Sequence, residues 1–322
     1  MIVLLFTGGT ISMRYDPSAG GAVPALSGRE ILEATRGIER VACVEVEEWG
    51  AFPGPHMTVE RMWALRERIA WHLARPEVEG VVVTHGTDSL EESAYLMARS
   101  LPEEKPIVFT GAMRNASDLG WDGPANLLDA VRVAASPGAR GYGAMVAISG
   151  RVFTALDVTK AHTHLLDAFE SPGVGPVAVV DDGTVIFRRA LPPVLPRLAP
   201  DAPALPIDIV YSWTGADERL LDASRQSARG VVLAAMGRGN IPPAMVPAVQ
   251  RWIDDGKPVV ISSRVHRGRV GETYGYPGGG RRLHEMGAIL AIGRRPPQAR
   301  IDLMLALGLG MDGEALRAVF EG

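Results

Sequence analysis

The sequence predicts two α/β domains: a larger N-terminal domain with a mostly parallel sheet and a β-hairpin, and a smaller C-terminal domain with a parallel sheet. Short apolar segments alternate with amphipathic helical segments, a rhythm typical of right-handed β-α-β crossovers. The chain has 322 residues, more than one hydrophobic core usually supports. Between domains expected at residues 1–190 and 207–322, the proline-rich stretch 191–206 cannot sustain a helix or a central strand and predicts a linker.

Composition and charge exclude several classes of protein. With 47% hydrophobic and 22% charged residues, the chain can form a large core and lacks the signature of disorder. Its net charge of −4, with no basic stripe, argues against nucleic acid as a partner. The first apolar segment is too short to cross a bilayer and no basic segment precedes it, so we expect no membrane association and a cytoplasmic protein. The single cysteine, Cys43, cannot form an internal disulfide, and its apolar surroundings predict a small core residue.

The first domain begins with a buried strand at residues 2–6, and a Thr-Gly-Gly-Thr turn at 7–10 follows it directly. Two residues without a Cβ let a ligand approach the backbone, so this turn is a catalytic loop, a phosphate cradle or a simple tight turn. Helices are predicted after the capping residues Ser27 and Thr58, and between Gly123 and Ala135. Further strands are predicted at residues 41–49, 80–84, 106–110 and 144–148, and a hairpin at 177–180 and 184–187.

The second domain repeats the alternation of strands and helices over a shorter length. Strands are predicted at residues 208–211, 230–235 and 258–262, and a helical stretch at 244–255. Because helical segments separate these strands, we expect a second parallel sheet. The two halves share an architecture but no residue-level repeat.

Two threonines follow strands of the first predicted sheet, Thr10 after the first strand and Thr87 after the strand at 80–84. The carboxyl ends of parallel strands share one edge, so we expect both hydroxyls and Asp88 to converge in one pocket. A threonine hydroxyl attacks a carbonyl when a neighbouring group takes its proton and backbone N–H groups stabilise the oxyanion. Lys160 is a candidate base if burial favours its neutral amine.

Four motifs occur along the first domain in a fixed order: TGGTI at 7–11, THGTDS at 84–89, GAMR at 111–114 with DG at 122–123, and DVTK at 157–160. In this order they resemble the successive signatures of the L-asparaginase/glutaminase family. Past the proline-rich stretch, residues 237–240 and 263–265 are similar to parts of the family's second domain. The resemblance therefore covers essentially the whole chain.

The resemblance implies hydrolysis of the side-chain amide of a small amino acid through a threonine acyl-enzyme, without a metal or an organic cofactor. We expect the substrate to be L-asparagine, which gives L-aspartate and ammonia. Residue by residue, it matches Thr10 to the primary nucleophile. It matches Thr87, Asp88 and Lys160 to the second threonine with its acid and lysine partners. A homodimer or homotetramer is also implied.

The same resemblance implies a set of substrate-binding groups. The backbone carbonyl of Ala112 falls where the family holds the leaving amide. Asp88 would bind the α-amino group of the substrate, and Gly86 belongs to the same binding loop.

Two positions depart from the family's pattern. The family usually carries a tyrosine on a mobile flap near the first threonine, but Ala22 stands there and Tyr15 lies several residues earlier. Tyr15 is either the flap base from another point or a surface aromatic. Where the family uses a serine and a polar neighbour for the substrate α-carboxylate, this chain has Gly54 and Pro55, so a backbone N–H and His56 are expected to bind it.

Other functions stay open from the sequence. The departures allow an amidohydrolase for glutamine or a related amide, and a catalytically weak amino-acid-binding sensor of the same fold. A nucleotide-binding oxidoreductase is excluded, because the first turn is not G-x-G-x-x-G and no helix starts directly after it. His162 and His164 lack the spacing and further ligands of a zinc site, so no metal is expected.

Overall fold

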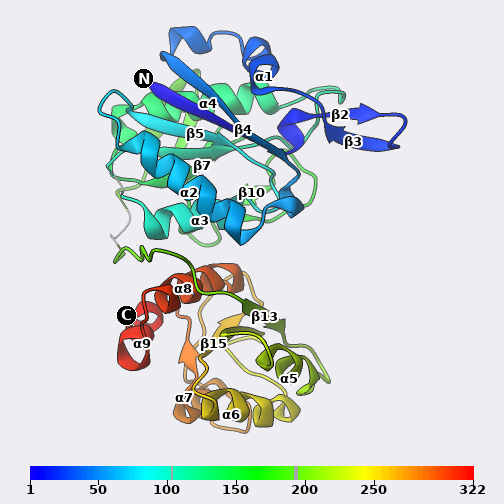
Figure 1. The fold of residues 1–322 in the computed structure, drawn as a ribbon, viewed down its shortest axis with the longest axis vertical. Helices are drawn as coiled ribbons and strands as arrows, with labels where there is room; N and C mark the ends of the chain where they lie inside the picture. The colour runs from blue at the N-terminus through cyan, green and yellow to red at the C-terminus, as the bar shows by residue number, and fades with distance from the viewer. Residues whose placement is uncertain (103, 192–194) are drawn as a thin grey trace. The chain divides into compact units, whose positions relative to one another are not determined.

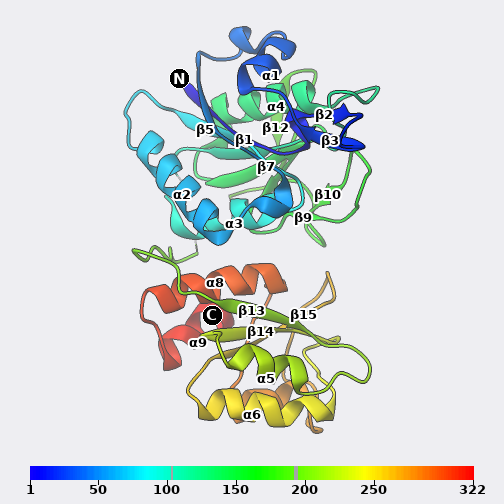
Figure 2. The same ribbon diagram turned by 45° about the vertical axis from the view of Figure 1, so that its right-hand side comes forward.

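The structure, a computed structural model, describes residues 1–102, 104–191 and 195–322. It divides into two compact units, Met1–Arg197 and Leu198–Gly322, which Figures 1 and 2 show from two directions. The division falls inside the proline-rich stretch 191–206, of which residues 192–194 lie outside the described residues. Throughout the described ranges, no helix combines the length and the apolar character needed to cross a bilayer.

An eight-stranded sheet organises the larger unit, with the strand order β12-β11-β8-β7-β6-β5-β1-β4. The five neighbouring strands β4, β1, β5, β6 and β7 are parallel, whereas β8, β11 and β12 pair antiparallel. The strand bounds are β1 Ile2–Gly8, β4 Val44–Phe52, β5 Gly80–Thr84, β6 Ile107–Thr110, β7 Ala144–Ile148, β8 Arg151–Thr154, β11 Ala178–Asp181 and β12 Thr184–Phe187. The predicted mostly parallel sheet and the predicted hairpin, β11–β12, are confirmed.

Helices cover both faces of this sheet (Figure 2). On one face α1 (Gly28–Ala34) packs beside α4 (Gly123–Ala135), and on the other α2 (Val59–Leu73) packs beside α3 (Leu90–Ser100). Because both faces are covered, the inner parallel strands are mostly apolar, and all residues of β1, β5 and β7 are buried. The predicted caps are confirmed: Ser27 forms a capping box with Glu30, and the Thr58 side chain caps α2.

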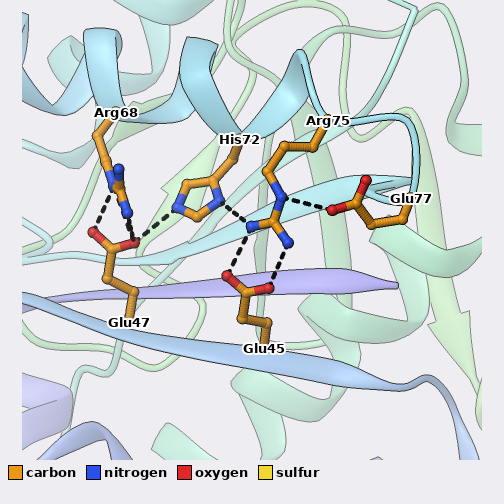
Figure 3. A network of polar contacts seen from close by, with 6 residues as sticks. All are labelled: Glu45, Glu47, Arg68, His72, Arg75 and Glu77. Carbon is orange, nitrogen blue, oxygen red and sulfur yellow. Dashed lines mark hydrogen bonds and ion pairs between the residues drawn. The ribbon is translucent and has the colours of Figure 1, made fainter.

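A polar network lies along β4, the edge strand of the sheet (Figure 3). Glu47 accepts hydrogen bonds from Arg68 Nε at 2.8 Å and from His72 Nε2 at 2.8 Å. Glu45 accepts two hydrogen bonds from Arg75, at 2.8 and 2.7 Å, and these bonds lower the pKa of the Glu45 carboxyl. Charged side chains on an edge strand hinder its pairing with another chain, so this network protects the open edge.

Three features of the larger unit differ from the sequence predictions. The segment after Thr10, for which no strand was predicted, forms an antiparallel hairpin of β2 (Met13–Asp16) and β3 (Gly21–Pro24). Strand β4 extends to Phe52, because its pairing with β1 continues past a register shift to Gly8. Cys43 is exposed rather than part of the core, since it precedes β4 at the open edge of the sheet.

The smaller unit contains a parallel sheet with the order β13-β14-β15-β16. Buried residues of α5, α6 and α7 form a core with this sheet, and α8 packs on its opposite face (Figure 2). The bounds are β13 Ile207–Tyr211, α5 Arg219–Arg225, β14 Gly230–Ala235, α6 Val246–Asp254, β15 Val259–Ser263, α7 Gly280–Met286, β16 Ile289–Leu290, α8 Pro296–Gly308 and α9 Gly313–Glu321. The predicted second parallel sheet is confirmed, with the short β16 as an additional strand.

Candidate active site

The loops that follow β1, β4 and β5 meet through three glycines at the carboxyl edge of the larger sheet. A Cβ atom on Gly9 would lie 2.5 Å from the backbone nitrogen of Gly86, and one on Gly86 would lie 2.4 Å from Cα of Gly54. Gly9 also has a φ of +87°, which other residues rarely adopt. Side chains at these positions would push the loops apart, so the glycines bring the neighbouring residues together.

Thr10 begins a 3-10 turn, Thr10–Ser12, directly after Gly9. The backbone N–H and the hydroxyl of Ser12 both donate to the Gly9 carbonyl, at 3.0 and 2.9 Å. Ile11 and Ser12 are buried, whereas Thr10 is half-buried. The turn is therefore fixed from within, and Thr10 lies on the loop that contacts Gly86.

Thr87, Asp88 and Lys160 form one hydrogen-bonded group. The Lys160 Nζ donates to Thr87 Oγ1 at 2.9 Å and to Asp88 Oδ1 at 2.6 Å. Thr87 is 5% exposed and the Lys160 side chain 17% exposed, whereas the Asp88 side chain is 59% exposed. The lysine thus contacts a buried hydroxyl on one side and an accessible carboxylate on the other.

His85 supports the turn that carries Thr87. Its Nδ1–H donates to the Gly86 carbonyl at 2.9 Å, and its Nε2 accepts the hydroxyl proton of Ser93 at 2.9 Å. Burial lowers the pKa of this imidazole to about 4, so the ring is neutral near pH 7. A neutral ring with both nitrogens engaged holds the loop and supplies no charge to the site.

The loop after β6, which carries Ala112, is held by two residues at the start of α4. Asp122 accepts a hydrogen bond from the Met113 backbone N–H at 3.1 Å, and Asn126 Nδ2 donates to the Gly111 carbonyl at 2.9 Å. Asn126 also donates to Asp122 at 2.9 Å. Neither Asp122 nor Asn126 was predicted as a site residue, although their i,i+4 spacing at a helix start is a signal that could have indicated this role.

Gly54, Pro55 and His56 form a 3-10 turn between β4 and α2. Gly54 is buried against the Thr87 loop: its carbonyl accepts the Ser89 hydroxyl at 2.7 Å, and a Cβ on it would lie 3.2 Å from the Asp88 Cβ. Pro55 and His56 are exposed. The structure therefore brings Gly54 to Asp88, and leaves the next two side chains on the surface.

Tyr15 lies on the β2–β3 hairpin, directly opposite Ala22. Its side chain is 57% exposed, and its backbone N–H donates to Ser117 Oγ at 2.9 Å. Within the described part of the chain, no hydrogen bond joins the Tyr15 hydroxyl to Thr10 or Lys160. The hairpin thus docks on the loop after β6 through its backbone and leaves the tyrosine ring accessible.

The arrangement has the parts of a nucleophile with its base. A hydroxyl in contact with an amine, which a carboxylate in turn holds, is the geometry that moves a proton to or from an attacking oxygen. The glycine contacts place Thr10 and Thr87 on touching loops. Such a site can attack a carbonyl and handle the protons of the reaction.

Nearly the whole chain matches models of a known family. Residues 1–193 match the N-terminal domain of asparaginase, and residues 206–320 match the C-terminal domain of glutaminase/asparaginase. The chain belongs to the asparaginase family. Four sequence motifs had suggested this membership, which the matches to both domains confirm.

Relatives in this family match the chain along nearly its full length. A probable L-asparaginase of Deinococcus radiodurans is 38% identical, with 99% of this chain and 96% of the relative covered. An L-asparaginase of Bacillus licheniformis is 32% identical, with 97% of each covered. The crystal structure of a probable cytoplasmic L-asparaginase from Campylobacter jejuni superposes with a TM-score of 0.89 at 30% identity, covering 99% of this chain and 98% of that chain. The family fold is therefore present in both units.

Proposed function

We propose that this protein is an L-asparaginase, which hydrolyses the side-chain amide of L-asparagine to L-aspartate and ammonia through a threonine acyl-enzyme. The observation that carries the proposal is the Lys160 Nζ, 2.9 Å from Thr87 Oγ1 and 2.6 Å from Asp88 Oδ1, in a member of the asparaginase family. A hydroxyl and a carboxylate that are both hydrogen-bonded to one amine can supply proton transfer without a cofactor.

In the proposed acylation, the Thr10 hydroxyl oxygen attacks the carbonyl carbon of the asparagine side chain. The Thr10 proton passes to Thr87 and Lys160. The oxyanion of the tetrahedral intermediate is stabilised by backbone N–H groups of the glycine-rich loops. The C–N bond then breaks, the nitrogen takes up a proton and leaves as ammonia, and Thr10 is left as an ester. Water adds to this ester, giving L-aspartate and restoring the Thr10 hydroxyl.

Lys160 and Thr87 are the proposed proton carriers in both halves of the reaction. As a neutral amine, Lys160 accepts a proton through the Thr87 hydroxyl, and Asp88 orients the ammonium that forms. Tyr15 is proposed as a further base from the hairpin. Directly opposite residues of an antiparallel pair share one face, so Tyr15 presents its ring on the face where Ala22 stands.

Substrate recognition in this proposal divides between two loops. The exposed carboxylate of Asp88 binds the substrate α-ammonium, and the Ala112 carbonyl accepts an N–H of the leaving amide. The α-carboxylate is bound next to Gly86, by the Gly54 backbone and His56.

Gly54 also favours a second candidate, an amidohydrolase for glutamine or a related small amide. Gly54 lacks the serine hydroxyl with which the family binds the substrate α-carboxylate, and the exposed Pro55 replaces the polar neighbour. The loss of such hydrogen-bonding partners changes substrate discrimination by a large factor. The protein is further proposed to be cytoplasmic, since the superposed structure is of a probable cytoplasmic L-asparaginase. It is also proposed to form a homodimer or homotetramer, as the family resemblance implies.

Ammonia release from L-asparagine, L-glutamine and D-asparagine by the purified protein tests the proposal, with Thr10→Ala beside it. We expect L-asparagine to be the best substrate and Thr10→Ala to lose at least ~10³-fold in kcat. Thr184→Ala, which removes an exposed threonine of β12, is the matched control and keeps wild-type turnover. Normal turnover by Thr10→Ala would sink the nucleophile assignment, and glutamine turnover above that of asparagine would favour the second candidate.

A further inference from the structure

Lys160 lies on a very small piece of secondary structure. It belongs to β9 (Thr159–Lys160), which pairs only with β10 (Phe169–Glu170) in a separate two-stranded ladder. A two-stranded ladder of this length is marginal by itself. The position of the Lys160 amine therefore depends on contacts from outside the ladder.

Such a contact comes from Glu91, in the first turn of α3. Its Oε2 accepts the backbone N–H of Lys160 at 2.6 Å. Glu91 is half-buried and lies four residues after Thr87 along the chain. The segment 87–91 thus holds Lys160 at three points: the amine at Thr87 and Asp88, and the backbone at Glu91.

We propose that Glu91 is a positioning residue, which fixes the backbone of Lys160 so that its amine stays within hydrogen-bond distance of the Thr87 hydroxyl. The inference rests on the proposed function, in which Lys160 and Thr87 carry the proton. Glu91 itself touches neither the reacting atoms nor the substrate in this scheme.

The physical reason is the length of the lysine side chain. Without the bond to Glu91, the contacts of Lys160 with segment 87–91 would be those of its amine alone. The flexible four-carbon side chain would then let the backbone of the ladder shift, and the geometry between the amine and the Thr87 hydroxyl would vary. A misplacement of about 1 Å in a catalytic group can cost about 10²-fold in rate. A charge-assisted hydrogen bond to the backbone removes that freedom at the base of the side chain.

The test compares Glu91→Ala, Glu91→Gln and the wild-type full chain. Alanine removes the acceptor, whereas glutamine keeps an acceptor oxygen and removes the charge. We expect kcat for L-asparagine to fall about 10- to 100-fold in Glu91→Ala with KM changed less than about threefold, and Glu91→Gln to recover kcat to within about threefold. Glu33→Gln, at an exposed position on α1, removes the same charge on the other face of the sheet and leaves kcat unchanged.

A second readout, amide hydrogen exchange at Lys160, reports the anchor without any substrate. We expect exchange to be at least ~10-fold faster in Glu91→Ala and close to wild type in Glu91→Gln. Unchanged kcat and unchanged exchange in Glu91→Ala would overturn the proposal while wild-type turnover keeps the asparaginase assignment. An inactive wild type would contradict the proposed function instead, and the exchange measurement would still decide whether Glu91 fixes Lys160.

Discussion

Two charged groups in the larger unit differ in how completely their charges are paired. In the network along β4, Glu45 and Glu47 each accept more than one hydrogen bond, and Arg75 also pairs with Glu77 at 2.9 Å (Figure 3). At the carboxyl edge of the sheet, the Lys160 Nζ contacts a hydroxyl on one side and an exposed carboxylate on the other. Arginines cannot give up a proton, whereas a lysine can, so the first group is structural and the second is suited to chemistry.

Among the variants that test this comparison, the largest effect is expected from Lys160→Met, which removes the amine and keeps the length of the side chain. We expect kcat to fall by about 10²–10⁴-fold, the usual contribution of a positioned proton carrier. Lys105→Met is the matched control, because the Lys105 ammonium donates to the carbonyls of Leu73 and Arg75 at the end of α2. Equal kcat values for the two variants in an ammonia-release assay would contradict a role of Lys160 in proton transfer.

Tyr15→Phe tests whether the hydroxyl of Tyr15, on the β2–β3 hairpin, takes part in the reaction with Thr87, Asp88 and Lys160. If the Tyr15 hydroxyl takes part in proton transfer, kcat falls by about 10- to 100-fold while the hairpin stays docked through its backbone bond to Ser117. Steady-state kinetics of ammonia release measures this directly. An unchanged kcat would assign the proton transfer to Lys160 and Thr87 and leave Tyr15 as a surface residue.

Glu47→Gln tests the structural group, and its effect should appear in stability alone. Burial raises the pKa of Glu47, but hydrogen bonds from Arg68 and His72 outweigh this, and the net pKa is lowered. A lowered carboxyl pKa stabilises the fold above the unfolded value of about 4.3, and this contribution is lost as the pH falls through the folded pKa.

We therefore expect the thermal midpoint of Glu47→Gln at pH 7 to lie about 2–4 °C below wild type, with kcat within twofold. The difference in Tm should shrink as the pH falls below about 4. Glu39→Gln is the control, because the Glu39–Arg40 pair is exposed and spans 3.9 Å. A loss of kcat in Glu47→Gln without a change in Tm would break the comparison.

Local patterns predicted the elements whose signals lie within a few residues. The strand Gly80–Thr84 and the helix Gly123–Ala135 have the predicted bounds, because an apolar run and a helical repeat mark them along the chain. The β2–β3 hairpin was not predicted, since its strands are only four residues long and its glycine and proline residues are typical of a loop. Two-residue strands such as β9 and β16 are too short to show a periodic pattern, and they form because they pair with a neighbouring strand.

The sequence by itself determined the family, the two α/β sheets and the motifs after each strand. The reason is that the succession of strands along the chain and the residues of each turn form local patterns. Only the tertiary structure decided which side chains meet. Lys160 and Thr87 are 73 positions apart, and their 2.9 Å contact follows from a two-residue strand placed beside α3. Likewise, the contacts of Gly9, Gly86 and Gly54, and the bond from Lys160 to Glu91, depend on how the loops pack at one edge of the sheet. Packing between distant segments sets these distances, and no local pattern along the chain records them.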